Sequence, residues 1–436
     1  MLSLVIVSLA CCLLTHATTV DEESYIAPLN YECPSGSGTI NFAETHITEI
    51  GPGFINNSIV TCLDLKNNQI QRVTVGAFDS LPNLKQLNLA MNKMQNLDDL
   101  FSSSSMLNLE VLNLTKNRQA FNSNNRLYIA GSFPSLRTLS LDQNFIVLIE
   151  SKEQLPFPKL ERLDLSRNQF ASQSFSEIVP SSIKFLNFST NKITNFIGKN
   201  WTNLSTLDLS HNQFKGIAYN NVSSYNVTLV DLKSLRNLTL AFNSINTIKQ
   251  DAFTDTGNLE VLDLTYNYLS SIPMDVLTPL KSLKVFLLGH NSLREVPRHQ
   301  SLLPLVTLDL GNNLITTVSD HAFLWAYNLK ILRLNNNKIE QIYRSAFILM
   351  EQLEVLDLSS NKLSMLPSDW CSQLTNLQYL DLSNNRFTSF EFTEITSTLP
   401  LKYLFFEYNT LKYLKTSTIL LPFCHPVDDT VRRRIS

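Results

Sequence analysis

The sequence predicts an α/β solenoid, in which short parallel β-strands stack along one side of a row of repeats. Three observations predict this fold class. The phrase L-x-x-L-x-L-x-x-N-x-L begins fifteen times, most of its starts lie 21–25 residues apart, and Asn fills its ninth position every time. The fifteen starts are Val60, Leu84, Leu109, Leu136, Leu160, Ile183, Leu204, Leu235, Leu259, Leu283, Leu305, Leu329, Leu353, Leu377 and Leu401.

Each position of the phrase has a physical role. Side chains alternate along a strand, so positions 4 and 6 point to one face and positions 3, 5 and 7 to the other. The apolar face must be buried, and because one repeat cannot bury it alone, neighbouring repeats stack. Each fully buried Leu contributes ~1.5–3 kcal/mol. The Asn ends the strand, where its side chain can bond backbone groups that the turn leaves unpaired.

The second half of each repeat is expected to form the convex side of the solenoid. Apolar residues recur at position 14, and Phe recurs at position 19. The residues at position 14 are Val73, Ile248, Ile272, Val318, Ile342, Leu366 and Phe390, and those at position 19 are Phe78, Phe253, Phe323 and Phe347. The longest interval between repeats contains a polar loop at 219–228, which we interpret as a tolerated surface insertion.

The first residues and the charge indicate where the protein acts. An apolar run at 2–14, followed by Thr-His-Ala, predicts a signal peptide at 1–17. No later stretch approaches the ~20 apolar residues of a membrane-spanning helix, so we expect a secreted, extracellular protein with no membrane span. The net charge is −3, and the block of like charge at 432–434 is short, which argues against nucleic acid as the partner.

The repeats divide the chain into four parts. We expect the signal peptide at 1–17, an N-terminal cap at 18–59, the solenoid of fifteen repeats at 60–411, and the end of the last repeat with a tail at 412–436. The tail has apolar residues but little chain remains to cover them, and an uncovered apolar end requires a partner. The C-terminal end therefore predicts a homo- or heterodimer, with a disordered terminus as the alternative.

The repeats resemble the leucine-rich repeat family in its typical subtype of ~24 residues. The resemblance rests on the fifteen phrases and on the Ala-Phe pairs at 77–78, 252–253, 322–323 and 346–347, and it extends over residues 37–424. Toll-like receptor ectodomains, chaoptin-like proteins and secreted leucine-rich immune proteins share this subtype. The resemblance implies a curved horseshoe with its parallel sheet on the concave side and a short-helical or irregular convex side. Two family features are missing after Asn409: a C-terminal cysteine cap and a signalling domain.

Four cysteines remain after the signal peptide is removed, which allows three pairings. A Cys33–Cys62 bridge would close a loop of about 30 residues and pin the cap, with a contribution of ~3 kcal/mol. Cys371 and Cys424 lie two repeats apart, and a bridge requires their Cα atoms within ~7 Å. Either the tail folds back and the two pair, which we favour, or Cys371 is a buried thiol and Cys424 bridges to another chain.

Glycosylation signals are unevenly distributed. All eight Asn-x-Ser/Thr sequons precede residue 240. They are Asn56, Asn113, Asn187, Asn200, Asn203, Asn221, Asn226 and Asn237. By their repeat positions, Asn113, Asn187 and Asn237 project from the concave strands, so sugars would obstruct the first half of that face and leave the second half bare. Chance scatter is the alternative.

The bare half has aromatic residues and an Arg at positions that the motif leaves open, which are the residue types of binding hot spots. The candidate ligand-binding residues are Phe242, Tyr266, His290, Arg333, Tyr379, Tyr403, Phe405 and Tyr408. All of those at positions 3 and 5 are expected to be exposed. We interpret the valines and aspartates of the same columns as ordinary filler of the repeat.

Catalytic motifs are missing from the sequence: it has no H-E-x-x-H, G-x-S-x-G, P-loop or dinucleotide fingerprint, and its seven histidines are dispersed. We therefore expect no enzyme activity, no cofactor and no metal. The leading hypothesis is a secreted protein that recognises an extracellular protein ligand, with an immune role implied by the family resemblance. A cell-adhesion or matrix protein and a truncated Toll-like receptor ectodomain are the alternatives.

Overall fold

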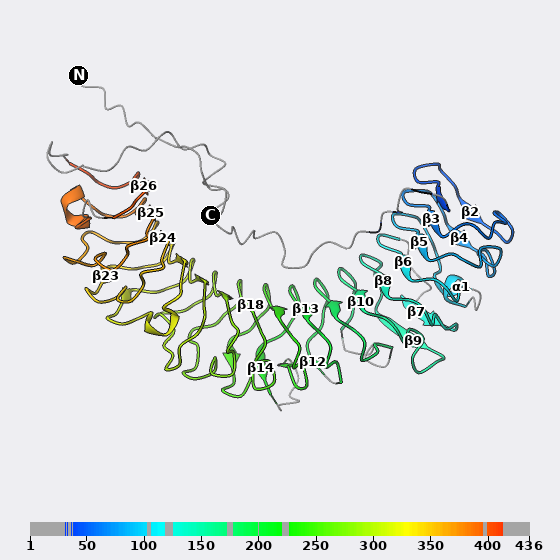
Figure 1. Ribbon diagram of the computed structural model, residues 1–436, viewed down its shortest axis with the longest axis horizontal. Helices are drawn as coiled ribbons and strands as arrows, with labels where there is room; N and C mark the ends of the chain where they lie inside the picture. Colours follow the sequence, from blue (N-terminus) through cyan, green and yellow to red (C-terminus); the bar gives the residue numbers. More distant parts are fainter. Residues whose placement is uncertain are drawn as a thin grey trace, which may run out of the picture. The chain divides into compact units, whose positions relative to one another are not determined.

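The structure is a computed structural model of the 436-residue chain (Figure 1). It describes residues 31, 33, 36, 38–102, 106–117, 125–171, 178–198, 200–219, 226–395 and 399–412. The solenoid falls into two compact units, the N-terminal unit, Pro28–Leu262, and the C-terminal unit, which runs from Asp263 onward.

In the N-terminal unit, each repeat contributes one short strand to a parallel sheet whose strands follow one another in chain order. Equivalent positions of neighbouring repeats pair in the sheet, as Leu163 pairs with Leu139 of the preceding repeat. The strands are β1 (Thr39–Asn41), β3 (Cys62–Asp64), β5 (Gln86–Asn88), β6 (Val111–Asn113), β8 (Thr138–Ser140), β10 (Arg162–Asp164), β11 (Phe185–Asn187), β13 (Thr206–Asp208) and β16 (Asn237–Thr239). The predicted parallel solenoid is confirmed.

The C-terminal unit repeats the same arrangement. Its sheet is formed by β19 (Val285–Leu287), β20 (Thr307–Asp309), β22 (Ile331–Arg333), β24 (Val355–Asp357), β25 (Tyr379–Asp381) and β26 (Tyr403–Phe405). Strand β18 (Val261–Asp263) spans the boundary between the units. Within each unit these strands line the inner side of the coil, and this side is called the concave face below (Figure 1).

The opposite side of the coil has more strand and less helix than the resemblance implied. Its strands pair in parallel: β2 (Glu49–Ile50) with β4 (Arg72–Val73), β7 (Arg126–Ile129) with β9 (Leu148–Ser151), β21 (Thr317–Val318) with β23 (Gln341–Ile342), and a sheet of β12 (Phe196–Ile197), β15 (Asn226–Thr228), β14 (Gly216–Ala218) and β17 (Thr247–Ile248). The described helices are α1 (Asp98–Phe101) and two 3₁₀ turns, η1 (Leu324–Ala326) and η2 (Phe390–Thr393). Several of these strands carry a position-14 residue, which is buried.

The long insertion of the N-terminal unit is not a loop throughout. Its last residues, Asn226–Thr228, form β15, which lies between β12 and β14 in the second sheet. Val227 is fully buried there. The expectation of a polar surface loop at 219–228 is therefore wrong for this end of the segment, because Val227 faces the interior and the backbone of β15 is paired on both sides.

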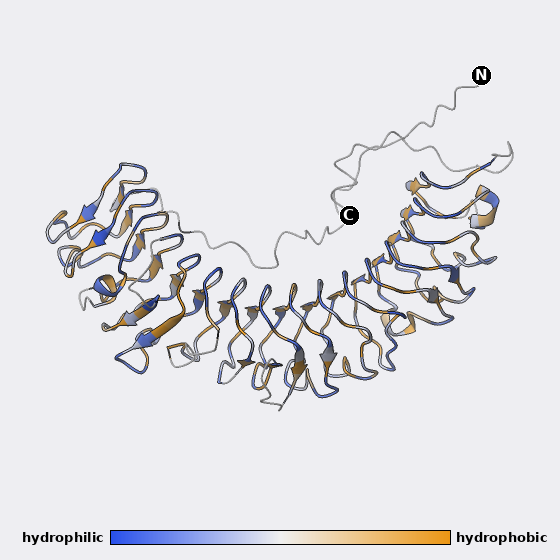
Figure 2. Cartoon of the chain, turned by 180° about the vertical axis from the view of Figure 1, so that it is seen from behind, coloured by the Kyte–Doolittle hydropathy of each residue, from blue (hydrophilic) through white to orange (hydrophobic). Residues whose placement is uncertain are grey.

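The core is built from the apolar positions of the phrase. In the repeat that starts at Leu329, the residues Leu332, Leu334 and Ile339 are all 0% exposed. On the convex side, Phe323 and Phe347 occupy position 19 of successive repeats and stack with ring centroids 5.9 Å apart. Figure 2 shows apolar segments recurring in each coil of both units. Stacking thus buries the apolar stripe that a single repeat would expose.

The asparagines at position 9 form a buried ladder that joins neighbouring repeats. Asn337 donates through Nδ2 to the backbone oxygens of Leu310 (2.9 Å), one repeat earlier, and of Leu334 (3.1 Å) in its own repeat. Its Oδ1 accepts the backbone N–H of Ile315 at 3.0 Å. Equivalent bonds recur along the chain, for example at Asn313. The ladder satisfies backbone groups that the turn would otherwise leave buried and unpaired.

Position 8, immediately before each ladder asparagine, has a left-handed backbone in all fifteen repeats, with φ between 52° and 59°. Asn occupies it in several repeats, but Phe242, Tyr266, His290 and Tyr408 also do. A non-glycine residue pays ~1–2 kcal/mol in this conformation, and Asn, Asp and His tolerate it best. The repeat geometry therefore projects every position-8 side chain from the same kind of turn.

The predicted Cys33–Cys62 disulfide is confirmed, with Cα atoms 5.8 Å apart. Cys371 is buried, and its Sγ lies 3.8 Å from the backbone oxygen of Glu394. Cys424 lies outside the described residues, so both the intrachain and the interchain pairing of Cys371 and Cys424 remain predictions.

We predict that Asn337→Ala lowers the free energy of unfolding by about 1–3 kcal/mol, because an unsatisfied buried backbone group costs ~1–3 kcal/mol and the variant leaves the N–H of Ile315 without its partner. The oxygens of Leu310 and Leu334 each lose one of two asparagine donors, since Asn313 and Asn361 still bond them. Urea denaturation followed by circular dichroism measures the change. The control is Lys338→Ala, whose side chain is exposed on the next residue. Similar losses in both variants would contradict a special role for the ladder.

Candidate ligand-binding surfaces

The last two strands of the C-terminal unit bring three candidate aromatic residues together on the concave face. Tyr379 lies with its ring centroid 5.2 Å from that of Phe405 and 6.3 Å from that of Tyr403. The expectation that all three are exposed is wrong for Tyr379 and Phe405, which are 6% and 9% exposed. Neighbouring strands lie only ~4.8 Å apart, so large rings on adjacent strands cover one another. Tyr403 is half-buried.

Arg333 stands in a row of aspartates on the same face. In the parallel register, Asp309 of β20 and Asp357 of β24 flank it, and Asp381 follows on β25. Burial raises the pKa of Asp357 to about 6; the hydrogen bonds from Ser359 oppose this rise, the neighbouring Asp381 adds to it, and Arg333 opposes it. This part of the face is thus an acidic row that includes one guanidinium.

The aspartates of this row also have a structural role. Oδ1 of Asp357 accepts the backbone N–H of Ser359 at 2.9 Å, and Oδ1 of Asp381 accepts that of Ser383 at 2.8 Å. The same bond ends strands elsewhere, as at Asp64 of β3. It is an Asx turn that closes the strand. These contacts support the interpretation of position-5 aspartates as part of the repeat framework.

Aromatic rings at position 8 stack in pairs at the ends of the strands. In the C-terminal unit, Tyr266 stacks on His290 with centroids 3.9 Å apart and planes 10° apart. In the N-terminal unit, His211 stacks on Phe242 at 4.2 Å and 9°. Tyr266 and Phe242 are each 42% exposed, and Tyr408 is 81% exposed. The two histidines are exposed as well, so the rings at position 8 are accessible where those within the sheet are covered.

Sequence reasoning identified Phe242, Tyr266 and His290 as one row but missed His211 as a ring partner. His211 shares position 8 with Phe242, although the two repeats start 31 residues apart. The shared position 8 could have identified this pair. The insertion that lengthens the interval follows the strand, so β13 and β16 still pair in register.

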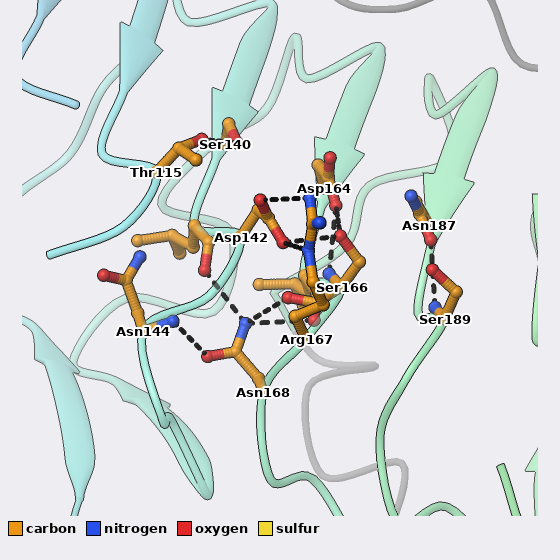
Figure 3. Close-up of polar contacts among 12 residues, drawn as sticks. Thr115, Ser140, Asp142, Asn144, Asp164, Ser166, Arg167, Asn168, Asn187 and Ser189 are labelled. Carbon is orange, nitrogen blue, oxygen red and sulfur yellow. Dashed lines mark hydrogen bonds and ion pairs between the residues drawn. The ribbon is translucent and has the colours of Figure 1, made fainter. Parts of the chain in front are cut away.

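A polar network on the concave side of the N-terminal unit was not expected (Figure 3). Asp142, whose side chain is 4% exposed, accepts two bonds from Arg167, at 2.7 Å from Nε and 2.8 Å from the second terminal nitrogen. Ser166 Oγ lies 2.9 Å from Asp142 and 2.6 Å from Asp164. The sequence feature that could have predicted this pair is an acidic residue at position 7, Asp142, and an Arg at position 8 of the next repeat, Arg167. The packing of successive repeats brings these two positions together, and the pair forms a bidentate ion pair.

The sequon asparagines differ in accessibility. Asn113 is 5% exposed, and its Oδ1 accepts the N–H of Thr115 at 3.0 Å. Asn187 makes the equivalent bond, and Asn237 donates to a neighbouring hydroxyl. Asn221 lies outside the described residues. The exposed asparagines are Asn56, Asn200 and Asn203. Glycan attachment on the concave strands therefore stays a prediction, and the exposed turns are the better-presented acceptors.

Two further observations bound the chemistry of the described residues. Within the described ranges, no group of three or more His, Cys, Asp and Glu side chains is arranged to hold a metal ion. In that same part of the chain, none of the helices has both the length and the apolar character needed to cross a bilayer.

A parallel solenoid with a ladder of buried asparagines and rows of exposed side chains defines a repeat-built scaffold protein. Leucine-rich repeat family models match residues 36–155, 159–186, 203–224, 233–293 and 327–387. The chain belongs to the leucine-rich repeat family.

Several curated proteins are similar to this chain over part of its length. Mouse keratocan is 33% identical over 36% of this chain and 43% of its own length. Bovine osteomodulin is 30% identical over 48% of this chain and 46% of its own. Toll-like receptor 2 of Cricetulus griseus is 31% identical over 38% of this chain and 20% of its own. The matches therefore span less than half of each of these relatives.

Solved structures agree on the fold. A leucine-rich repeat protein of Leptospira interrogans superposes with a TM-score of 0.58 and 26% identity, over 79% of this chain and 90% of its own. Drosophila Toll in complex with Spatzle gives a TM-score of 0.58 at 21% identity, over 84% of this chain and 46% of Toll. The second likeness concerns the fold alone.

We predict that Asp357→Asn raises thermal stability at pH 7.5 and has little effect near pH 3.5. The pKa of this carboxyl is raised above 3.8 in the folded state, so the folded protein binds the proton more tightly and loses stability as pH rises from about 4 to 6. The neutral amide removes up to about 3 kcal/mol of this penalty. Calorimetry at both pH values measures it, on protein from a host that does not N-glycosylate, because the substitution creates an Asn-Leu-Ser sequon at 357–359.

The matched control for this substitution is Asp64→Asn, which replaces the same repeat position on β3 and the same Asx-turn acceptor. An Asp357→Asn effect of equal size at pH 3.5 and pH 7.5 would contradict the electrostatic explanation, because a change in packing alone does not depend on pH.

Proposed function

We propose that this chain is a secreted, non-catalytic recognition protein that binds extracellular protein ligands of pathogen or host origin through its repeat surface, with a role in innate immunity. No cofactor takes part. The observation that carries the proposal is the exposed stacked pair Tyr266 and His290 in the C-terminal unit. Tyr403, Arg333 and Tyr408 are further candidate contacts of this unit. The buried ring of Tyr379 packs against Tyr403 and against the buried ring of Phe405.

The backbone makes this pair informative. Position 8 is left-handed, and Asn fits it with less strain, as Asn312 and Asn336 do in neighbouring repeats. A Tyr at φ 53° with 42% exposure is neither the residue type that this turn favours nor a core residue. Rigid aromatic side chains lose little conformational entropy when a partner binds and dominate many interfaces. We infer that these rings are present for contact with a ligand.

The comparisons support the class of partner. Drosophila Toll, which shares the fold, is solved with Spatzle bound. The partial likeness to Toll-like receptor 2 supports an immune role. The signal-peptide pattern at 1–17 and the sequons support secretion.

The alternatives are a cell-adhesion or matrix protein and a truncated Toll-like receptor ectodomain. The matches to keratocan, podocan and osteomodulin support the adhesion or matrix alternative. The match to a small share of Toll-like receptor 2 supports the alternative of a truncated ectodomain. Fractionation of an expressing culture separates the first alternative from the leading proposal, since a soluble recognition protein accumulates in the medium, whereas an adhesion or matrix protein stays with the cell or matrix fraction.

The binding role is tested with a Tyr266→Asn, His290→Gly double variant, which removes both rings without creating an Asn-x-Ser/Thr sequon. We expect the variant to keep or slightly raise the melting temperature, since Asn and Gly suit the left-handed turn, and to lose at least ten-fold in affinity for its extracellular protein ligand. Immobilised wild type and variant are exposed to the same extracellular fluid, retained proteins are quantified by mass spectrometry, and the affinity of the principal one is measured with purified protein.

The control is Tyr343→Ser, which removes a ring that is also 42% exposed but lies on the convex side after β23. Unchanged retention by the double variant, or an equal loss in Tyr343→Ser, would contradict recognition by the position-8 pair.

We further propose that the C-terminal end supports a homo- or heterodimer, with Cys424 as the residue able to join chains. Gel electrophoresis with and without reductant, combined with light scattering of the secreted protein, tests this proposal. A species of doubled mass that reductant dissociates is the expected result. A monomer under both conditions would contradict the assembly and favour the intrachain pairing of Cys371 with Cys424.

A further inference from the structure

The N-terminal unit has a contact on its concave face that the proposed recognition surface does not involve. Cys62 occupies position 3 of β3, so its side chain points to the concave side, and its disulfide holds Cys33 there. Gln86 occupies the same position on β5, directly opposite Cys62 in the register. Its Nε2 donates to the backbone oxygen of Tyr31 at 2.8 Å. Cys33 is therefore held at β3 and the backbone of Tyr31 at the neighbouring strand β5, both on the concave face.

The side chain of Tyr31 continues in the same direction, toward β8 and β10. Its phenol lies near Ser140 on β8, near Asp142, and near Arg162 and Asp164 on β10. The hydroxyl is buried but makes no hydrogen bond of normal geometry with the described residues. Burial is the main cause that raises the pKa of Tyr31, so the phenol stays protonated and remains a hydrogen-bond donor.

The groups around the phenol are able to bind a hydroxyl. Ser140 shares a hydrogen bond with Thr115 at 2.7 Å, and burial raises the pKa of Asp164 to about 6 (Figure 3). The guanidinium of Arg162 lies 4.6 Å from the ring centroid of Phe185, and its Nε is buried without a hydrogen-bond partner among the described residues. Hydrogen-bond donors and acceptors thus lie together around the phenol, and one of them, Arg162, packs on the ring of Phe185.

Among the described residues, two buried polar atoms lack a well-formed hydrogen bond, which makes Tyr31 an imperfect occupant. An unsatisfied buried group costs ~1–3 kcal/mol; within the described part of the chain Arg162 Nε has no partner, and the contact of the phenol with Ser140 falls short of normal hydrogen-bond geometry. What holds the side chain in place is its short tether, because the disulfide two residues away gives it an effective concentration on the order of mM. A free segment that completes the hydrogen bonds would bind the same place better than the tethered residue does.

We propose that the concave face between β5 and β10 is a binding site for a tyrosine side chain on an extended peptide segment, and that the chain's own Tyr31 occupies this site. An external segment must displace Tyr31 to bind. The site is independent of the proposed recognition surface, which lies at position 8 and in the C-terminal unit, so either proposal can fail without the other.

The test uses the full chain carrying Tyr31→Ala and an acetylated, amidated peptide, Pro-Leu-Asn-Tyr-Glu-Ser, copied from residues 28–33 with Ser in place of Cys33. Isothermal titration or fluorescence anisotropy measures its affinity. We expect the variant to bind the peptide about ten-fold or more tightly than wild type, since the tethered competitor is removed. A peptide with Ala in place of Tyr should not bind either protein.

Three further variants make the result specific. Tyr31→Phe keeps the ring in place and should bind the peptide no better than wild type. Ser140→Ala in the Tyr31→Ala background should weaken peptide binding, whereas Ser210→Ala, which follows β13 outside the proposed site and belongs to no sequon, should not. Should Tyr31→Ala fail to fold, the Cys33→Ser, Cys62→Ser chain, which lacks the tether, should bind the peptide more tightly than wild type.

Equal and weak peptide binding by wild type, Tyr31→Ala and the disulfide-free chain would overturn the proposal and leave Tyr31 as a packing residue of the cap. A light-scattering change from dimer to monomer in Tyr31→Ala would also overturn it, because the site would then be filled by a second copy.

Discussion

Every surface of this protein depends on the hydrogen bonds of the position-9 asparagine. One side chain bonds two backbone oxygens and one backbone N–H, and these groups belong to two successive repeats, as at Asn337. The turn that the asparagine closes holds position 8 in a left-handed conformation, so the residue before it must project from the turn. The ladder therefore sets the spacing of the repeats and the direction in which the candidate binding residues point.

Constant spacing turns the repeat positions into columns, and a side chain's exposure depends on its neighbours in the column. At position 8, Tyr266 and His290 meet face to face and stay accessible at the end of the strands. At positions 3 and 5, Tyr379 and Phe405 meet within the sheet and shield each other. Equivalent ring chemistry thus gives a contact surface in one column and an internal support in another.

The sequence predicts well which repeat position each residue occupies, but it predicts poorly which side chains touch across neighbouring repeats. The period and the ninth-position Asn were sufficient for the strands, the core and the Cys33–Cys62 bridge. They did not predict that Val227 enters a convex sheet, that Arg167 pairs with Asp142, or that Tyr379 is covered. Each of these depends on which side chain stands beside which in the next repeat, and pattern reasoning treats one repeat at a time. Tyr31 was harder still, because it precedes the first repeat and belongs to no column.

The two units therefore differ in what a ligand must do to bind. In the N-terminal unit the concave face already has an occupant, and a ligand gains only the difference between its own contacts and those of Tyr31. In the C-terminal unit the rings of Tyr266 and His290 are ordered before any partner arrives, and the backbone strain of their turn is present in the free protein as well. Since that strain is equal in the free and bound states, it does not reduce affinity, and a partner that contacts the rings retains most of its burial energy. A rigid scaffold that accepts local strain in its turns is therefore suited to recognition by a surface formed in advance.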